Sequence, residues 1–285
     1  MVKALCYGSL NPDLVHHVAR IPVLGDDLFS ERWQMVYGGG GGNAAVALAT
    51  WGVDTVVIGH ALGADPLGDW LLETLSRPHL DLSRIRQDPD VRTPHCVVMI
   101  TPDGDRTILS TGYGDARWQE VPEITWEGVD VALVDGYSAK SGGRVAAEAV
   151  RRGIPVVGLD AEPPTARLSS LVVWSRHEHP EEAEAHDLSI GGHPVALTGG
   201  SAEIAMWWGD RTYRTAPPPI TPVDGAGAGD VFAAMGGLGL ADSWDPERLL
   251  RMATAAGALL AGRGRAAGVP SLEEIAGVAA GLEVW

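Results

Sequence analysis

Short apolar runs alternate with amphipathic segments along most of this 285-residue chain, and this alternation restricts its fold more than any other feature. Strands that alternate with helices are typical of a mostly parallel sheet covered by helices on both faces. We expect strands at 4–7, 55–59, 96–100, 131–135, 155–160, 170–174 and 194–197. We expect helices at 43–51, 66–75, 142–152, 181–185, 228–239, 246–261 and 271–282. The sequence therefore predicts an α/β fold whose ligands lie beyond the carboxyl ends of its parallel strands.

The formal net charge of −16 limits the partners of this protein. It repels the phosphates of nucleic acid and an anionic membrane surface alike. Cys6 and Cys96 lie in apolar runs, which indicates buried thiols in a reducing compartment and not a disulfide. The start, MVKALCYGSL, is interrupted too soon for a signal peptide, and no apolar run reaches transmembrane length. We therefore expect a cytoplasmic protein without a nucleic-acid or membrane partner.

Two regions interrupt the alternation of strands and helices. Residues from about 14 to 36 contain Pro22, Gly25 and alternating segments, and residues 91–112 are typical of two strands around a turn. Asp103-Gly104 in that turn is a strong hairpin signal. We expect these insertions to form a small β lid on a single domain that spans residues 1–285.

The stretch VDGAGAGDVFAA, which starts at Val223, places three glycines at alternate positions before an apolar run. Glycine permits unusual backbone conformations and allows a ligand to approach closely. If a helix begins near Ala228, the amides of Gly227, Ala228 and Gly229 point out of its N-terminus and form an anion hole. Asp230 in the first turn is then a candidate general base. The alternative is a flexible loop in which Asp230 is only a favourable first-turn charge.

A second glycine run, Gly38 to Gly42, precedes the small-residue segment NAAVALATW. Small side chains allow such a helix to pack tightly and expose its backbone to a polar ligand. Asn43 at its start is a candidate partner for a substrate hydroxyl. The alternative is that Asn43 is simply the N-cap of the helix.

The segment RHEHPEEAEAHD, residues 176–187, is the dense charge cluster of the sequence. His177, His179 and His186 allow a metal site as one interpretation. We favour a solvated acidic helix with nearby histidines, because no cysteine lies close in sequence to complete a tetrahedral zinc site.

Together, the two glycine-rich stretches resemble the ribokinase-like (PfkB) family of sugar and nucleoside kinases. The run from Asp224 to Asp230 is similar to the family's late signature, Asp-Thr-x-Gly-Ala-Gly-Asp. The run from Gly38 to Asn43 is similar to its early signature, Gly-Gly-x-Gly-x-Asn. GADPLGDWLL and GDRTIL match two further family patterns, so the resemblance spans the whole chain. It implies a three-layer α/β/α fold with a small β lid and an ATP-dependent sugar kinase, with some likeness to the ketohexokinase subgroup.

The resemblance also implies a role for each matching residue. Asp230 is the implied general base, and Gly227, Ala228 and Gly229 are the implied anion hole. The implied sugar contacts are Asp13, Gly39, Asn43 and Arg106. The implied nucleotide and phosphate contacts are Thr198, Gly200, Asp224 and Gly225. ATP and Mg²⁺ are the implied cofactors, with Glu178 tied to the magnesium and a monovalent cation as a further candidate.

Two departures from the family pattern affect the phosphate and metal contacts. Gly225 replaces the usual threonine and removes a hydroxyl near the phosphates. The family's Asn-x-x-Glu reads Ser175-Arg176-His177-Glu178, so the glutamate is retained and the asparagine is not. Ketohexokinase-like members also lack this asparagine, which favours a ketose acceptor.

Two other functions stay open from the sequence. A nucleoside kinase of the same fold would stack its base on aromatic side chains, and Trp33, Tyr37 and Tyr113 are available near the lid. A sugar- or nucleotide-sensing protein without turnover would explain the two departures, although the retained Asp230 argues against it. Exposed lid strands have edges that favour pairing, and family members often pair their lids, so we expect a homodimer.

Overall fold

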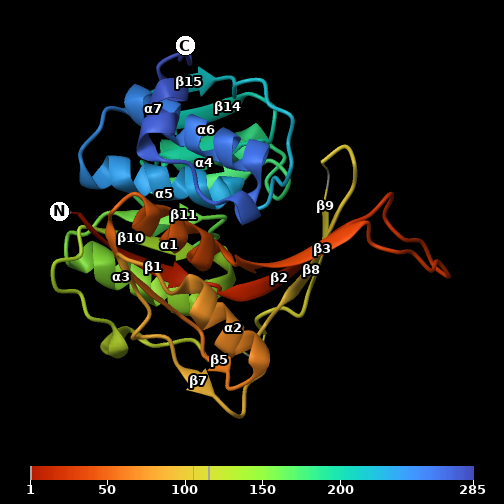
Figure 1. The fold of residues 1–285 in the computed structure, drawn as a ribbon. Coiled ribbons are helices and arrows are strands. Elements are labelled where there is room, and N and C mark those ends of the chain that lie inside the picture. The colour runs from red at the N-terminus through yellow and green to blue at the C-terminus, as the bar shows by residue number, and fades with distance from the viewer. Residues whose placement is uncertain (1, 105, 115) are drawn as a thin grey trace.

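Nine strands form the main sheet of the protein, in the order β15-β14-β13-β12-β11-β10-β1-β4-β6 (Figure 1). The computed structural model describes residues 2–104, 106–114 and 116–285, so position 105 of the expected lid hairpin lies outside the described residues. The strands of this sheet are β1 (Lys3–Gly8), β4 (Asp54–Gly59), β6 (Leu80–Asp81), β10 (Val131–Asp135), β11 (Val156–Leu159), β12 (Leu171–Ser175), β13 (Val195–Thr198), β14 (Ile204–Trp208) and β15 (Arg211–Thr215). Neighbouring strands from β6 to β13 run parallel, and β14 and β15 add an antiparallel edge.

Helices cover both faces of this sheet, because successive residues of its strands point to opposite sides. Cys6 and Leu133 pack in the core of α1, α2, α5, α6 and α7. Leu5 and Val134 on the same strands pack against α3, and Val172 farther along the sheet packs near α4. The helices are α1 (Gly40–Thr50), α2 (Pro66–Leu75), α3 (Ala139–Arg151), α4 (Glu182–Ile190), α5 (Ala228–Ala241), α6 (Pro246–Arg263) and α7 (Leu272–Ala279). The predicted three-layer α/β/α architecture is confirmed.

A smaller, four-stranded sheet, in the order β3-β2-β8-β9, extends from the main body (Figure 1). Its strands are β2 (Asn11–His17), β3 (Arg32–Gly38), β8 (Cys96–Ile100) and β9 (Arg106–Ser110). Val15, Val36 and Val98 belong to its small apolar core. These strands coincide with the expected lid insertions, but the pair β2–β3 starts before residue 14 and ends after residue 36, because its register continues to Asn11 opposite Gly38.

The predicted strands and helices are all present, with ends shifted by a few residues. The strands β2, β3, β14 and β15 and the two-residue strands β5, β6 and β7 were not predicted as strands. Helix α4 continues beyond its predicted end at residue 185, because Ala185 and Ser189, one turn apart, both face the interior. The remaining elements are two short strands, β5 (Leu62–Gly63) and β7 (Gln87–Asp88), and the 3₁₀ turns Val121–Glu123, Gly136–Ser138, Ala166–Leu168 and Arg265–Ala267. No helix in the described part of the chain combines the length and the apolar character that a bilayer crossing requires.

Glycines bring the start of α1 against the end of β1. A Cβ at Gly41 would lie 2.8 Å from the Gly8 Cα, and a Cβ at Gly59 would lie 2.1 Å from the Gly8 carbonyl oxygen. Gly39, the N-cap of α1, has φ +82°, and a Cβ there would lie 2.3 Å from the Ser9 carbonyl oxygen. The N-terminus of α1 therefore lies directly on the carboxyl edge of the main sheet.

Gly41→Ala tests this close approach. We expect a loss of about 1–3 kcal/mol in the free energy of unfolding, because the added methyl group meets backbone that cannot move aside. The matched control is Gly277→Ala in α7, where a Cβ would meet no atom within 4 Å. That variant should be more stable by about 0.5–1 kcal/mol, because alanine restricts the unfolded chain. Urea unfolding of both variants measures the difference; equal stabilities would contradict the packing described here.

Candidate active site

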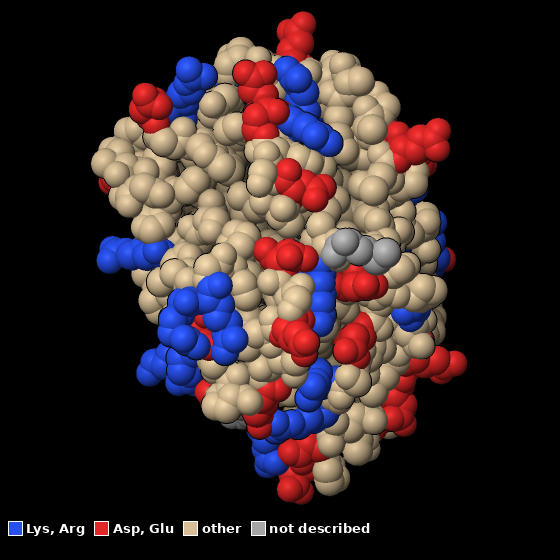
Figure 2. All heavy atoms as spheres, turned by 90° about the vertical axis from the view of Figure 1, so that its left-hand side faces the viewer, with Lys and Arg blue, Asp and Glu red and all other residues tan. Residues whose placement is uncertain are grey.

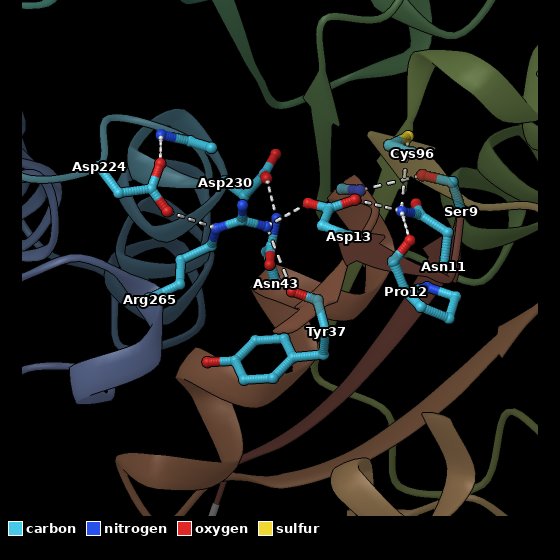
Figure 3. Close-up of polar contacts among 12 residues, drawn as sticks. Ser9, Asn11, Pro12, Asp13, Tyr37, Asn43, Cys96, Asp224, Asp230 and Arg265 are labelled. Carbon is cyan, nitrogen blue, oxygen red and sulfur yellow. Dashed lines mark hydrogen bonds and ion pairs between the residues drawn. The ribbon is translucent and has the colours of Figure 1, made fainter. Parts of the chain in front are cut away.

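The two glycine-rich segments meet at the carboxyl edge of the main sheet, where α1 and α5 begin (Figure 3). Asn43 Nδ2 in α1 donates a hydrogen bond of 2.8 Å to Asp230 Oδ2 in the first turn of α5, although the two residues are 187 positions apart. Gly227, the N-cap of α5, has φ +80°, and a Cβ there would lie 3.2 Å from Asn43 Nδ2. The interpretation of Asn43 as a helix N-cap is wrong, because Gly39 occupies that position and Asn43 points to Asp230.

Asp230 is a half-buried carboxylate with a raised pKa. Burial raises the pKa of Asp230, while the Asn43 hydrogen bond and the charges of Arg265 and Arg106 oppose the rise and Asp13 adds to it. A carboxylate with a raised pKa is a better proton acceptor, which suits a general base.

The first turn of α5 carries the amides that were predicted to form an anion hole. The first amides of a helix have no acceptor within the helix, and the helix dipole gives its N-terminus a partial positive charge. Asp224 Oδ1 accepts a hydrogen bond of 2.9 Å from the Ala226 amide and so fixes the preceding turn. The Ala228 amide keeps only a long hydrogen bond of 3.4 Å, to the Gly225 carbonyl oxygen. The turn is thus ordered while its amides stay accessible to an anion.

Asp13, on β2, lies on the lid side of this cluster and is buried. Asp13 Oδ1 accepts a hydrogen bond of 2.5 Å from Asn11 Nδ2, and Asn11 Oδ1 accepts one of 2.5 Å from the Tyr113 hydroxyl. A Cβ at Gly38 would lie 2.5 Å from Asp13 Oδ2, so glycine leaves the space that this carboxylate occupies. Gly39 beside it offers backbone and no side chain to a ligand.

Arg106 lies at the start of β9 and reaches towards the late glycine loop. Its Nη1 is 3.4 Å from the point where a Cβ of Gly225 would lie, and its charge lowers the pKa of Asp230. In the same hairpin, a Cβ at Gly104 would lie 2.9 Å from Pro222 Cγ. The lid hairpin therefore lies against the loop that leads to Asp230.

The sequence analysis missed Arg265, and it missed Asp135 and Asp160 as well. Arg265 follows α6 in a 3₁₀ turn, and its side chain is buried. Its guanidinium pairs with Asp13 Oδ2 and, at 3.2 Å, with Asp224 Oδ2, and it donates to the Tyr37 carbonyl oxygen at 3.2 Å (Figure 3). The available signal in the sequence was a run of arginines and glycines, GRGR, which is equally typical of an exposed helix end.

Two further carboxylates, Asp135 and Asp160, lie at the ends of the neighbouring strands β10 and β11. Asp135, at the end of β10, accepts hydrogen bonds from the amide and the hydroxyl of Ser9, both at 2.6 Å. Burial, with a contribution from the charge of Asp230, raises the pKa of Asp135 to about 6. Burial raises the pKa of Asp160 to about 7, and the charges of Asp230, Glu178 and Asp135 add to this rise. This edge of the sheet therefore carries more negative charge than its cations balance.

Thr198 and Gly200 lie at the end of β13, farther along the same edge. Thr198 Oγ1 donates to the Trp174 carbonyl oxygen at 3.2 Å. Gly200 has φ +62°, and a Cβ there would meet no atom within 4 Å. No hydrogen bond recorded among the described residues joins either of them to Asp230, so they form a second part of the edge and not part of the Asp230 cluster.

The histidines of residues 176–187 do not gather into a metal site: among the described residues, no group of three or more His, Cys, Asp and Glu side chains could hold a metal ion. His179 instead stacks on Trp174, with ring centroids 4.0 Å apart and an interplanar angle of 10°. Glu162 and Glu184 lie 3.6 and 3.7 Å from its ring nitrogens.

Comparisons with known proteins agree with this geometry. Residues 1–154 and 166–272 match the family described as "pfkB family carbohydrate kinase". A ribokinase of Lactococcus lactis subsp. lactis (strain IL1403) is 25% identical over 301 residues, and the match covers 100% of this chain and 99% of the ribokinase. A fructokinase of Salmonella typhimurium is 26% identical, and the match covers 76% of this chain and 82% of the fructokinase. The structure of an Arabidopsis thaliana ribokinase complexed with ribose and ATP superimposes with a TM-score of 0.81 at 22% identity, over 98% of this chain and 99% of that one. The chain belongs to the pfkB family of carbohydrate kinases and is a phosphotransferase with a hydroxyl group as acceptor.

Proposed function

We propose that this protein transfers the γ-phosphate of ATP to a hydroxyl group of a small sugar, a pentose or a ketohexose. The observation that carries the proposal is the Asp230–Asn43 hydrogen bond at the N-terminus of α5, which places a basic carboxylate beside accessible helix amides. Relatives named ribokinase and fructokinase support these two acceptor classes. The presence of Asp230 and of its hydrogen bond to Asn43 argues against a sensing protein without turnover.

The acceptor hydroxyl attacks the γ-phosphorus in line, its proton passes to Asp230, and the bond between the γ-phosphorus and the bridging oxygen breaks to release ADP. The amides of Gly227, Ala228 and Gly229 stabilise charge on the equatorial oxygens of the phosphoryl group. Asp13, Gly39 and Asn43 hold the acceptor, and Arg106 approaches from the lid. In this reaction the lid excludes water, which limits wasteful hydrolysis of ATP.

Thr198 and Gly200 are the proposed nucleotide contacts, and Asp224 and Gly225 the proposed phosphate contacts. Glu178, whose charge acts on Asp160, is the proposed contact of Mg²⁺ through water, and the raised pKa values of Asp135 and Asp160 support a cation at this edge. Mg²⁺ often uses only one or two carboxylates together with water and substrate phosphates, which fits an edge without a complete protein ligand set in the described residues. When bound, Mg²⁺ neutralises phosphate charge. A monovalent cation at Asp224 would compete with Arg265 and the Ala226 amide, which already engage both carboxylate oxygens.

The nucleoside-kinase alternative gains no aromatic platform from the three residues named for it. Trp33 is exposed and stacks on His16, Tyr37 is buried, and Tyr113 packs against Tyr137 with centroids 5.3 Å apart. A panel of pentoses, ketohexoses and nucleosides in a coupled ADP-release assay decides among the acceptors. A protein that binds sugar without releasing ADP with any of them would contradict the kinase proposal.

The exposed apolar side chains of the lid support a homodimer formed through it. Trp33, Ile108 and Leu109 are exposed by 63%, 48% and 67%. We also propose that the protein acts in the cytoplasm and has no nucleic-acid partner. On the face shown in Figure 2, acidic and basic side chains alternate along the middle, and a small basic group lies at the lower left.

Asp230→Asn removes the proton acceptor and keeps the size of the side chain. We expect kcat to fall by a factor on the order of 10²–10⁴, with thermal stability and ATP affinity close to those of the wild type. The control is Asp242→Asn at the exposed C-cap of the same helix, which should retain full activity. Steady-state kinetics on the best acceptor of the panel measure both variants. Wild-type kcat in Asp230→Asn would rule out the assigned base.

Asp160 gives the ligand-free protein a defined pH dependence. Its folded pKa is raised, so between the usual aspartate value and about 7 the folded protein holds a proton that the unfolded chain has released, and stability falls as the pH rises through this window. Asp160→Asn removes this loss, and the decline between about pH 5.5 and pH 7.5 should shrink by about 1–2 kcal/mol. Urea unfolding at both pH values measures the change. An identical decline in both proteins would contradict the raised pKa.

Leu109→Glu tests the lid dimer, because a charge in a buried apolar interface destabilises association. We expect the wild type to be dimeric and Leu109→Glu monomeric by light scattering after size-exclusion chromatography. Ile190→Glu, at an equally exposed isoleucine of α4 on the main body, should remain dimeric. A monomeric wild type, or a variant that stays dimeric, would contradict the proposal.

A further inference from the structure

We propose that Arg265 is a positioning residue that acts as a built-in counter-cation: it fixes the acceptor-binding carboxylate Asp13 to the late glycine loop and so sets the distance between the acceptor and Asp230. The inference rests on the proposed function, since it assigns Arg265 to the same site.

The guanidinium joins three segments that are far apart in the sequence. It binds Asp13 on the lid strand β2, the Tyr37 carbonyl oxygen near the end of β3, and Asp224 before α5, at sequence separations of 252, 228 and 41 residues. Figure 3 shows the side chain crossing between Asp224 and Asp13, directly beneath Asp230 and beside Asn43. One buried group thus connects the lid to the loop that carries the base.

The pairing is electrostatically necessary at this place. Asp13 and Asp224 are both buried, and two ionised carboxylates in such surroundings are unstable without a cation between them. A planar guanidinium can serve two acceptors at once through separate N–H groups, whereas a lysine ammonium is a point charge on a flexible stem. Removal of Arg265 therefore leaves two buried carboxylates without the cation that pairs with both of them.

The same side chain reaches the catalytic cluster. A Cβ at Gly227 would lie 3.0 Å from Arg265 Cδ, so the N-cap of α5 rests on this arginine. Its Nη2 is buried without a hydrogen-bond partner among the described residues, as is Asn43 Oδ1. Because the guanidinium holds Asp13, the proposed acceptor contact, its loss should weaken acceptor binding more than ATP binding.

The variants are Arg265→Ala, which leaves a space of guanidinium size, and Arg265→Lys, which keeps the charge without the fork. The matched control is Arg263→Ala, two residues earlier, whose ion pair with Glu274 lies on the surface. The readouts are KM for acceptor and ATP, kcat, the acid limb of the pH profile, and melting temperature with and without millimolar guanidinium chloride. The acid limb reports Asp230, which is faced by Asn43, Arg106, Asp13, Asp135, Asp160, Tyr137 and Arg265.

For Arg265→Ala we expect an acceptor KM raised about tenfold or more, an ATP KM near that of the wild type, and an acid limb moved to higher pH, because a positive charge near Asp230 is lost. Millimolar guanidinium should restore turnover and raise the melting temperature of this variant alone. If Arg265→Ala does not fold, Arg265→Lys decides: a raised acceptor KM with an unchanged ATP KM supports the inference, and wild-type values overturn it.

Wild-type kinetics in Arg265→Ala, or no specific effect of guanidinium on either its turnover or its melting temperature, would also overturn the inference. The melting-temperature readout needs no turnover, so it separates failure of this inference from failure of the proposed kinase activity. In the latter case guanidinium would still stabilise Arg265→Ala, while the wild type would release no ADP with any acceptor.

Discussion

The close backbone contact between Gly8, at the end of β1, and Gly41, in the first turn of α1, determines where the site forms. It allows α1 to begin directly on the carboxyl edge of the sheet, so that Asn43 reaches the start of α5, which packs in the same core. Bulkier residues at this contact would lift α1 away from the edge and separate Asn43 from Asp230. The hydrogen bond between them is thus a consequence of tight packing between a strand end and a helix start.

The charges of this edge follow from the same geometry. Parallel strands end side by side, so Asp135 and Asp160, which end or follow neighbouring strands, lie within electrostatic reach of Asp230. Uncharged donors compensate these carboxylates: Asp135 accepts hydrogen bonds from Ser9 and from the amides of Gly41 and Ser138. Asp160 accepts one of 2.9 Å from the Ser175 amide. An anionic nucleotide that approaches this edge meets the same carboxylates, and the proposed Mg²⁺ would supply the counter-charge.

The sequence predicted what local patterns encode and missed what depends on distant partners. The apolar runs of β1 and β10 and the glycine-Asp230 run before α5 are local signals, and the structure has a strand or a helix at each. Asn43 as a partner of Asp230 required a contact across 187 positions, and its local context was equally typical of an N-cap. Arg265 lies in a GRGR run typical of an exposed helix end, and only the folded chain brings Asp13 and Asp224 to it. The strands β14 and β15 were missed because their edge pairing is antiparallel in a sheet whose other signals were all parallel.

The glycines of the two segments leave room for charged side chains and adopt left-handed backbone conformations. These two roles explain them better than chain flexibility does. A Cβ at Gly38 would lie within 2.5 Å of the Asp13 carboxylate, and one at Gly227 would press on both Arg265 and Asn43. Gly225 has no side chain, and a Cβ there would lie 3.4 Å from Arg106 Nη1 of the lid. Glycines that suggest flexibility in the sequence therefore allow, in the fold, charged side chains to be held close together in fixed positions.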